Sequence, residues 1–537
     1  MLGTWKSLKS KEIRRRYGSY LRMKAMTEKR RQRAVEATEE HDDEHRPIKR
    51  SRTGLVTSKT TQPAFHAHRL NHVPKAPTHL LNVYVFGSGS MNELGMADDD
   101  VDVIYRPRLN PSLTREKAGV VTLAVGGMHT AVVTHDGRVL TWGVNDDFAL
   151  GRLTKNQVDE DGEPIDNDTL EGTPYPVEGE LLNKHVVKVV CSDNLTVAIT
   201  DEGECYAWGT FRCSDGILGF SATQKHSPSP TKIDIPEVAD VAVGTDHVLA
   251  LTTAGQVYAW GNGQQCQLGR EIPEAVRKEG LVPHLLNLKN ILAVGAGSYH
   301  SFAVDRDGRV YAWGLNAARQ CGIYYENNDE GVIVKEPTLV EALAPFKVES
   351  ITGGEHHSMA ILRGGRVLAW GRHDRHQLGI PEEELPSTVL RDDRGNIYSV
   401  PIPTIVPSLV DIVQVCCGTH HNLAIDKHGK AFSWGSGENY EVGQGTDDED
   451  VAIPTLIRSK AIKDVAIKVV GAGGQFSVIA GLPTESTTPK ITEKTPAVVR
   501  TTEDVSSQSG SITSAFTATS SVFVKDTTVT ETVYTSN

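Results

Sequence analysis

Histidine is the residue in this chain whose type and spacing could most readily do chemistry. Five histidines close a Gly-x-x-His motif, and each lies 13 residues before a tryptophan: His129, His247, His300, His357 and His421. A ring of imidazoles could bind a metal ion or move protons near neutral pH. Because each histidine recurs once per repeat in the same sequence context, we instead expect a structural role, with each imidazole bonding backbone inside its own repeat. The sequence indicates no metal and no cofactor.

The elements that position these histidines are short strands in a repeat of two halves. The second half is an apolar run that ends in Trp-Gly, and a further glycine follows the tryptophan after nine residues in most copies. The segment from His129 to Gly143, HTAVVTHDGRVLTWG, alternates apolar residues around an Asp-Gly pair. This pattern predicts a β-hairpin. Only the copy from Trp208 to Gly219 is longer, since its glycine follows the tryptophan after 11 residues.

The two halves are out of phase at the ends of the repeat region. The first Trp-Gly-like half, Val83 to Gly95, has no Gly-x-x-His half before it, and the last Gly-x-x-His-like half, Gly471 to Gly481, has no partner after it. Each half occurs seven times. If the orphan halves pair, the chain closes on itself without a free sheet edge. We therefore expect an all-β fold, a seven-bladed propeller closed by pairing of the N-terminal and C-terminal half-repeats.

Charge and composition divide the chain into three regions. Residues 1–80 carry 19 Lys and Arg against 8 Asp and Glu, whereas residues 81–481 carry 33 against 54. Residues 482–537 contain 24 Ser and Thr. We expect a basic, mostly disordered arm, the propeller and a disordered tail. No window is apolar enough to span a bilayer, so we expect no membrane association. Seven cysteines without a CxxC motif favour a reducing compartment.

The basic arm contains three clusters suited to anionic partners. The first is KEIRRR at residues 11–16, the second comprises Lys29, Arg30, Arg31 and Arg33, and the third comprises Arg46, Lys49, Arg50 and Arg52. Clustered Lys and Arg of this kind serve as nuclear import signals or neutralise phosphates. We expect binding to a nuclear import receptor and to chromatin, through DNA, core histones or both. Because the remainder of the chain is acidic, we expect DNA binding to reside in the arm or histones to meet a propeller face.

The repeat resembles that of the regulator of chromosome condensation family. Phe86 to Trp434 spans six repeats with a mean period of 58 residues, longer than WD40 or kelch repeats. The long copy, WGTFRCSDGILG, resembles the β-wedge of family members that exchange guanine nucleotide on the small GTPase Ran. The resemblance implies a nuclear, chromatin-associated, monomeric exchange factor without covalent chemistry. It assigns the wedge to Phe211, Arg212, Cys213, Ser214, Asp215 and Gly216.

The same resemblance implies three further site residues. Asp193 and Asp246 occupy the positions of family aspartates on the GTPase-binding face, and His356 matches a family histidine implicated in exchange. His420 holds the equivalent place in a neighbouring copy, and one of these two histidines can be incidental. Phe476 stands where animal relatives carry a histidine, so that role does not transfer. Cys213 and Ser214 also replace more polar residues of the family's wedge.

Two other classes of function compete with nucleotide exchange. A propeller of this type could be a non-catalytic scaffold that binds another GTPase or a ubiquitin-pathway protein, since fold alone does not define function. The wedge-like copy and the basic arm argue against that alternative. A hydrolase or metal enzyme is disfavoured because no nucleophile–base pair or ligand cluster stands out from the repeat.

Overall fold

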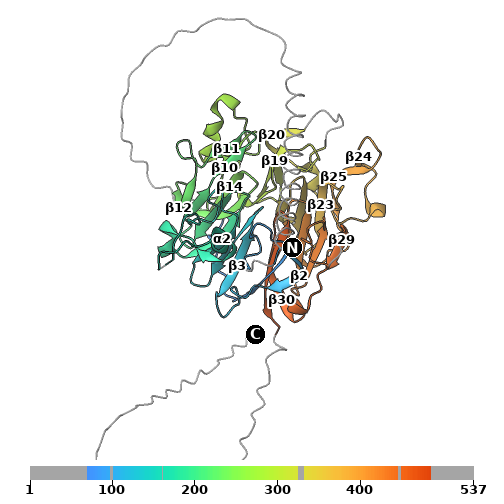
Figure 1. The fold of residues 1–537 in the computed structure, drawn as a ribbon. Helices are drawn as coiled ribbons and strands as arrows, with labels where there is room; N and C mark the ends of the chain where they lie inside the picture. The colour runs from blue at the N-terminus through green and yellow to red at the C-terminus, as the bar shows by residue number, and fades with distance from the viewer. Residues whose placement is uncertain (1–68, 97–100, 160, 325–331, 446–448, 485–537) are drawn as a thin grey trace, which may run out of the picture. The chain divides into compact units, whose positions relative to one another are not determined.

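The computed structural model describes residues 69–96, 101–159, 161–324, 332–445 and 449–484. The predicted disorder of the tail, and the import and chromatin clusters of the arm, lie outside these residues. Within them the chain forms seven sheets of four or five strands and one separate two-stranded hairpin (Figure 1). No helix among the described residues has the length and apolar character needed to cross a membrane.

The seven sheets are the blades of the propeller, numbered here in ring order, with strands given from the innermost outward. Blade 1 contains β30 (Val465–Ala472), β31 (Phe476–Pro483), β1 (Asn82–Ser88) and β2 (Val103–Leu109). Blade 2 contains β3 (Val120–Val125), β4 (His129–Thr134), β5 (Val139–Gly143) and β6 (Tyr175–Pro176). Blade 3 contains β7 (Val186–Cys191), β8 (Leu195–Thr200), β9 (Cys205–Gly209) and β12 (Ser227–Ile233). Blade 4 contains β13 (Val238–Val243), β14 (His247–Thr252), β15 (Val257–Gly261) and β16 (His284–Leu285).

The remaining blades follow the same plan. Blade 5 contains β17 (Ile291–Ala296), β18 (His300–Asp305), β19 (Val310–Leu315) and β20 (Ile333–Leu339). Blade 6 contains β21 (Val348–Gly353), β22 (His357–Leu362), β23 (Val367–Arg372), β25 (Ile397–Ile405) and β24 (Leu390–Arg391). Blade 7 contains β26 (Ile412–Cys417), β27 (His421–Asp426), β28 (Ala431–Gly435) and β29 (Val451–Leu456). Short helical turns join some strands: α2 (Asn167–Gly172), η1 (Gly179–Asn183), η2 (Glu274–Leu281), η3 (Glu341–Leu343), η4 (Glu382–Glu384) and η5 (Lys460–Ile462).

The ring closes through blade 1, as the phase of the repeat predicts. β1 from the N-terminal half pairs antiparallel with β31 from the C-terminal half, from Asn82 opposite Gly481 to Gly87 opposite Phe476. The innermost strands contact one another in ring order, β3, β7, β13, β17, β21, β26 and β30, and β30 contacts β3 again. Closure of this kind leaves no open sheet edge between the first and last blades. The all-β, seven-bladed fold is therefore confirmed.

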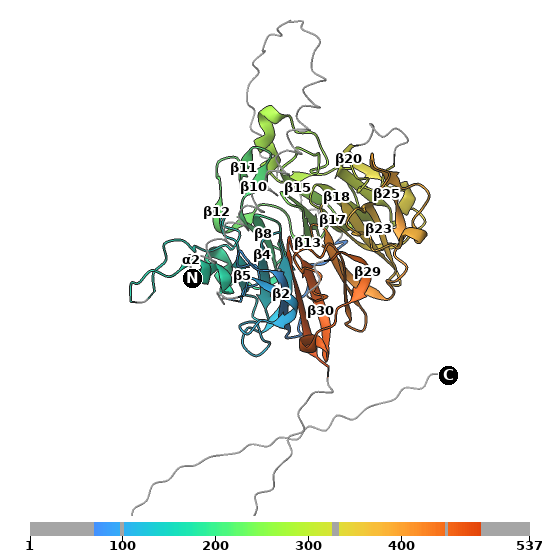
Figure 2. The ribbon, with the colours of Figure 1, turned by 45° about the vertical axis from the view of Figure 1, so that its right-hand side comes forward.

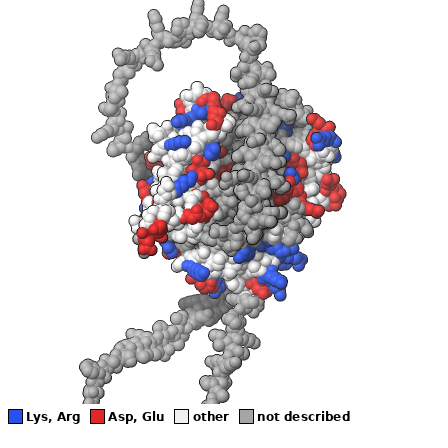
Figure 3. Space-filling model, viewed as in Figure 1, with Lys and Arg blue, Asp and Glu red and all other residues white. Residues whose placement is uncertain are grey.

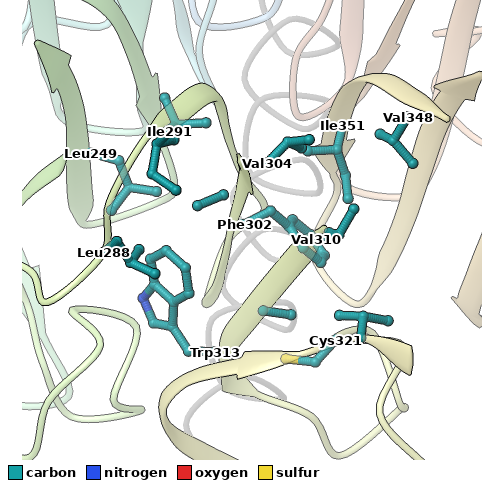
Figure 4. Close-up of a cluster of buried hydrophobic side chains, with 14 of the residues drawn as sticks. Leu249, Leu288, Ile291, Phe302, Val304, Val310, Trp313, Cys321, Val348 and Ile351 are labelled. Carbon is teal, nitrogen blue, oxygen red and sulfur yellow. The ribbon is translucent and has the colours of Figure 1, made fainter. Parts of the chain in front are cut away.

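Apolar side chains fill the spaces between neighbouring blades. One buried cluster draws Leu249 from blade 4, Phe302 and Trp313 from blade 5, and Ile351 from blade 6 (Figure 4). Phe302 and Trp313 have no exposed surface. The tryptophan of each Trp-Gly pair thus belongs to a core shared by adjacent sheets, which explains why the repeat needs it.

The repeat histidines join neighbouring blades, so the expectation of a backbone bond inside each blade is wrong. In five seams between blades, the imidazole Nε2 lies 2.7 to 2.9 Å from a side-chain oxygen of the next blade, in the pairs His129–Thr196, His247–Ser301, His300–Ser358, His357–Asn422 and His421–Ser477. The partner always directly follows the repeat histidine position of its own blade. The next blade supplies the bond because the imidazole points across the seam rather than along its own hairpin.

We call each of these histidine bonds to the next blade a latch. In each latch, the side chain that accepts from the histidine also donates a hydrogen bond to a backbone carbonyl. The Ser358 hydroxyl donates to the Gln320 carbonyl at 2.8 Å, and the Trp370 indole donates to the same oxygen at 2.9 Å. Since the hydroxyl gives its proton to the carbonyl, it accepts from His300 Nε2–H. Burial holds the pKa of His300 well below its usual value, so the ring is neutral. The same pair of bonds recurs at Ala149, Gln267 and Gln377. At Glu441 only the Ser477 hydroxyl donates, because Phe86 stands in place of the tryptophan. These bonds bind one blade to the loop of the preceding blade.

Two seams depart from the latch. Between blades 3 and 4, Leu195 and Val248 occupy the histidine and hydroxyl positions, so both partners have become apolar. Between blades 1 and 2, Phe476 replaces the histidine, and the buried Thr130 hydroxyl is left without a hydrogen-bond partner. The first seam is a consistent replacement, whereas the second leaves one polar group unsatisfied.

The antiparallel strand order defines two opposite faces. Each Gly-x-x-His turn and each connection from the third to the fourth strand lie at one end of a blade, here called the histidine-turn face. The Gly-containing hairpins and the linkers between blades lie at the other end, the hairpin face. Residues 69–80, which the sequence places in the arm, run along the hairpin face. There the amides of Leu70 and Asn71 donate to the Thr253 carbonyl at 2.7 and 2.9 Å.

Candidate functional site

The long repeat copy forms an extra hairpin on the histidine-turn face. It lies between β9 and β12 and consists of β10 (Phe211–Cys213) and β11 (Gly216–Gly219). Its root is buried through Phe211 and Leu218, whereas its tip residues Ser214 and Asp215 are exposed. Gly216 adopts a φ of 114°, which a glycine accommodates readily at the tip. We call residues 211–219 the wedge.

Asp246 lies at the root of the wedge. Only 8% of this residue is exposed, and its Oδ1 accepts a hydrogen bond from the Arg212 amide at 2.7 Å. On the other side, the Arg212 guanidinium donates to Asp147 Oδ2 at 2.6 Å. Asp147 belongs to blade 2 and Asp246 to blade 4, so both neighbouring blades hold the root of a hairpin that leaves blade 3.

Blade 4 also holds the wedge tip. The Gln264 side chain accepts from the Ser214 amide at 3.0 Å and donates to the Ser214 hydroxyl at 2.8 Å. Arg277, from η2, pairs with Asp215 at 2.5 Å. This hydrogen-bonded ion pair lowers the pKa of Asp215 and leaves the tip with little unpaired charge. Figure 2 shows β10 and β11 beside the light-green turn that contains η2.

Asp193 lies at the end of the central channel, in the Gly-x-x-His turn of blade 3. It lines a cavity of about 90 Å³ together with Gly127 of blade 2 and Thr245 of blade 4. A β-carbon on Gly127 would fall 2.4 Å from Asp193 Oδ1, so the glycine leaves room for the carboxylate. The structure thus places Asp193, Asp246 and the wedge on one face in adjacent blades.

His356 lies farther around the same face. Its Nε2 is 3.7 Å from Glu355 Oε1, and His420 Nε2 of blade 7 is 3.5 Å from Glu355 Oε2. The imidazole also lies 6.3 Å, centre to centre, from the Tyr299 ring of blade 5. Burial lowers the pKa of His420 despite the nearby carboxylate. Both candidate histidines therefore share one glutamate, and geometry alone does not select His356 over His420.

The face carries no recognisable metal site in the part of the chain that the structure describes, where no three His, Cys, Asp or Glu side chains group as ligands. Burial lowers the pKa of His129 and His357 to about 4 and of His247 and His421 to about 3. These imidazoles stay neutral at physiological pH. On the side of the molecule that Figure 3 presents, Lys, Arg, Asp and Glu side chains of the described residues are intermixed.

Sequence reasoning missed the residues that hold the wedge. Asp147 lies more than a hundred residues before Gln264 and Arg277, and none of the three occupies a recurring position of the repeat. Their only common feature is contact with residues 212–215. Such contacts depend on how three blades are arranged, which the repeat pattern does not specify. Glu355 was likewise missed, although it lies next to His356 in the chain.

Comparison with known proteins identifies the repeat. The family model described as RCC1-like domain matches residues 82–479. The protein pim1 of Schizosaccharomyces pombe is 62% identical over 444 residues, covering 83% of this chain and 82% of that protein. The guanine nucleotide exchange factor SRM1 of Saccharomyces cerevisiae is 38% identical over 422 residues, covering 75% of this chain and 87% of that protein.

Solved structures agree with this relationship. Saccharomyces cerevisiae Prp20p, described with its binding properties to Gsp1p and histones, superimposes with a TM-score of 0.71 at 37% identity, covering 78% of this chain and 94% of that one. Yeast RCC1 (Prp20) bound to Kap60 gives a TM-score of 0.73 at 36% identity, covering 81% and 97%. The chain therefore belongs to the RCC1-like, or regulator of chromosome condensation, family.

Proposed function

We propose that this protein is the guanine-nucleotide exchange factor for the small GTPase Ran. The observation that carries the proposal is the wedge, a braced hairpin that replaces a repeat loop on the histidine-turn face. The relative SRM1, named as a guanine nucleotide exchange factor, supports it over three quarters of the chain. Exchange at this site requires no covalent bond to change.

The mechanism is reciprocal coupling between two ligands of the GTPase. If the exchange protein binds nucleotide-free GTPase more tightly than nucleotide-bound GTPase, it must weaken the GTPase's affinity for nucleotide by the same ratio. A phosphate site is a concave group of N–H donors around Mg²⁺ and a lysine, so a hairpin pressed into it can displace its backbone. Because Arg277 pairs with Asp215, we assign the wedge a displacing role rather than competition for positive charge.

The site residues that the family resemblance implies then divide into two roles. Asp193, partly exposed at the channel end, is proposed to contact the GTPase, and His356 to do so near blade 6. Asp246 is proposed to act through the wedge, because its carboxylate is buried against the Arg212 amide. Replacing Asp193 with alanine should therefore weaken GTPase affinity, whereas Asp246→Asn should mainly lower the maximal release rate. Steady-state release of labelled GDP separates the two effects, and equal changes in both parameters for both variants would contradict the division.

Chromatin and import functions are proposed for the arm. The clusters at Lys29–Arg33 and Arg46–Arg52 supply the charge, and Prp20p is described with binding to histones and, as yeast RCC1, in complex with Kap60. Residues 69–80 leave the propeller on the hairpin face, opposite the wedge. A chromatin-bound arm would therefore leave the GTPase face open. We propose nuclear, chromatin-associated localisation on this basis.

One experiment tests the proposed activity. Release of labelled GDP should accelerate when this protein is added to Ran and should not accelerate on other small GTPases. Equal release with and without the protein, alongside stable binding to another GTPase or to a ubiquitin-pathway protein, would replace exchange with the scaffold function.

A further inference from the structure

The wedge cannot hold its own shape. It has two strands of three and four residues, and an isolated two-stranded hairpin is at best marginally stable in water. Its root is fixed by burial of Phe211 and Leu218, but the tip residues Ser214 and Asp215 project beyond the core. Whatever orients the tip must therefore come from outside the hairpin.

The tip contacts blade 4 at two points. Gln264 makes two hydrogen bonds to Ser214, one to its amide and one to its hydroxyl. Arg277 pairs with Asp215 and, at 2.6 Å, with Glu274 of its own helical turn. A cavity of only about 10 Å³ remains between the wedge and this part of blade 4.

These contacts come from the long connection between the third and fourth strands of blade 4. Gln264 follows the Trp260-Gly261 pair, and η2 fills the connection between β15 and β16. The Asn262 side chain holds Gln264 in turn, because Asn262 Oδ1 accepts a hydrogen bond from the Gln264 backbone amide at 2.9 Å. The glutamine is thus preset to meet Ser214.

We propose that Gln264 and Arg277 are positioning residues for nucleotide exchange. They hold the wedge tip at a fixed angle so that contact with the GTPase moves the phosphate-binding backbone rather than the wedge. This inference rests on the proposed exchange function. An exposed ion pair contributes little stability on its own, but an orienting contact affects rate through geometry.

The test uses the full-length chain and labelled GDP on Ran. Arg277→Ala and Gln264→Ala should each lower the maximal release rate about threefold, and the double variant should lower it about tenfold. The rate falls because a loosely held wedge tip contacts the GTPase in the wrong orientation. Affinity for nucleotide-free Ran should stay within about twofold. Arg277→Lys keeps the charge and should recover most of the rate. Lys427→Ala removes an ion pair of similar exposure on the hairpin face, at 2.8 Å from Asp411, and should leave the rate unchanged.

A second readout needs no GTPase. Deuterium uptake of the peptide spanning residues 209–220 should rise in the Gln264→Ala and double variants and stay unchanged in Lys427→Ala. If deuterium uptake rises in the variants but even the unaltered protein does not accelerate GDP release from Ran, Gln264 and Arg277 still hold the wedge tip and the proposed exchange function is wrong. Unchanged uptake, an intact maximal rate in the double variant, or a loss confined to affinity would each overturn the positioning role.

Discussion

The hydrogen bonds that join the blades repeat around the ring, whereas those that hold the wedge occur once. A latch pairs a buried histidine with the next blade and needs only the repeat to place both partners. The wedge is held by Asp147, Asp246, Gln264 and Arg277, which share no position of the repeat. The two regions meet at the seam between blades 3 and 4, where the wedge replaces the loop that elsewhere supplies the latch carbonyl.

The wedge explains why the histidine and hydroxyl of the repeat are replaced by apolar residues at that seam. Without the loop carbonyl, a hydroxyl at Val248 would have no acceptor, and a histidine at Leu195 would have no partner. An unsatisfied buried polar group costs about 1–3 kcal/mol, so an apolar pair is the better solution. The departure from the repeat is therefore a consequence of the wedge, and it marks the site of the proposed function.

Breaking the ring should have the largest effect. Deleting residues 485–537 should leave the melting temperature nearly unchanged, because β31 ends at Pro483. Deleting residues 465–537 removes β30 and β31, exposes the edge of β1 and should unfold or aggregate the protein. Thermal unfolding and size-exclusion chromatography compare the two, and equal effects of the two deletions would contradict closure through blade 1.

Acid should weaken the latched ring next most strongly. The five latch histidines have folded pKa values below the usual 6.5, so their contribution to stability is present above pH 6.5 and is lost as pH falls towards about 4. Burial raises the pKa of Glu93 and Glu441 to about 7, and these two contribute in the opposite sense, most below pH 4.5. Between these limits the five imidazoles take up protons on unfolding and the two glutamates release theirs, so the imidazoles outnumber the glutamates and stability falls as the pH falls.

A matched variant sharpens the acid prediction. Gln267, Gln320 and Gln377 hold the position of Glu93 and Glu441 in other blades and make the same bond to backbone. Glu93→Gln with Glu441→Gln should therefore steepen the acid loss measured by urea unfolding between pH 5 and 6. A slope that is flat, or unchanged in the variant, would contradict the protonation states given to the seams.

Substitution of Thr130 and Thr196, which follow the repeat histidine position in blades 2 and 3, should change stability in opposite directions. Thr130→Val removes the unsatisfied hydroxyl beside Phe476 and should stabilise the protein by about 1 kcal/mol. Thr196→Val leaves His129 Nε2–H without its acceptor and should cost about 1–3 kcal/mol. Urea unfolding at pH 7.5 measures both. Destabilisation by Thr130→Val would show that the seam between blades 1 and 2 does not differ from the others.

The sequence could predict whatever the repeat encodes. Counting the half-repeats predicted seven blades and closure through blade 1. The one departure from the constant spacing located the long copy, and the family resemblance assigned the wedge within it. The direction of the latches could not be read, because spacing does not say whether His300 points within its hairpin or across to Ser358. The partners of Arg212 and Ser214 depend on the relative placement of blades 2, 3 and 4, and only the fold brings them together.

The central claim is that the wedge, not the ring, drives nucleotide release. Replacing residues 212–216 with Gly and Ser keeps the buried root at Phe211 and Leu218 and so spares the fold. The measurement is release of labelled GDP from Ran by the unaltered protein and by this variant, with affinity for nucleotide-free Ran measured in parallel. The account predicts a rate at least tenfold lower, or about 1.4 kcal/mol, with the melting temperature and most of the affinity retained. Release by the variant at the unaltered rate would contradict it.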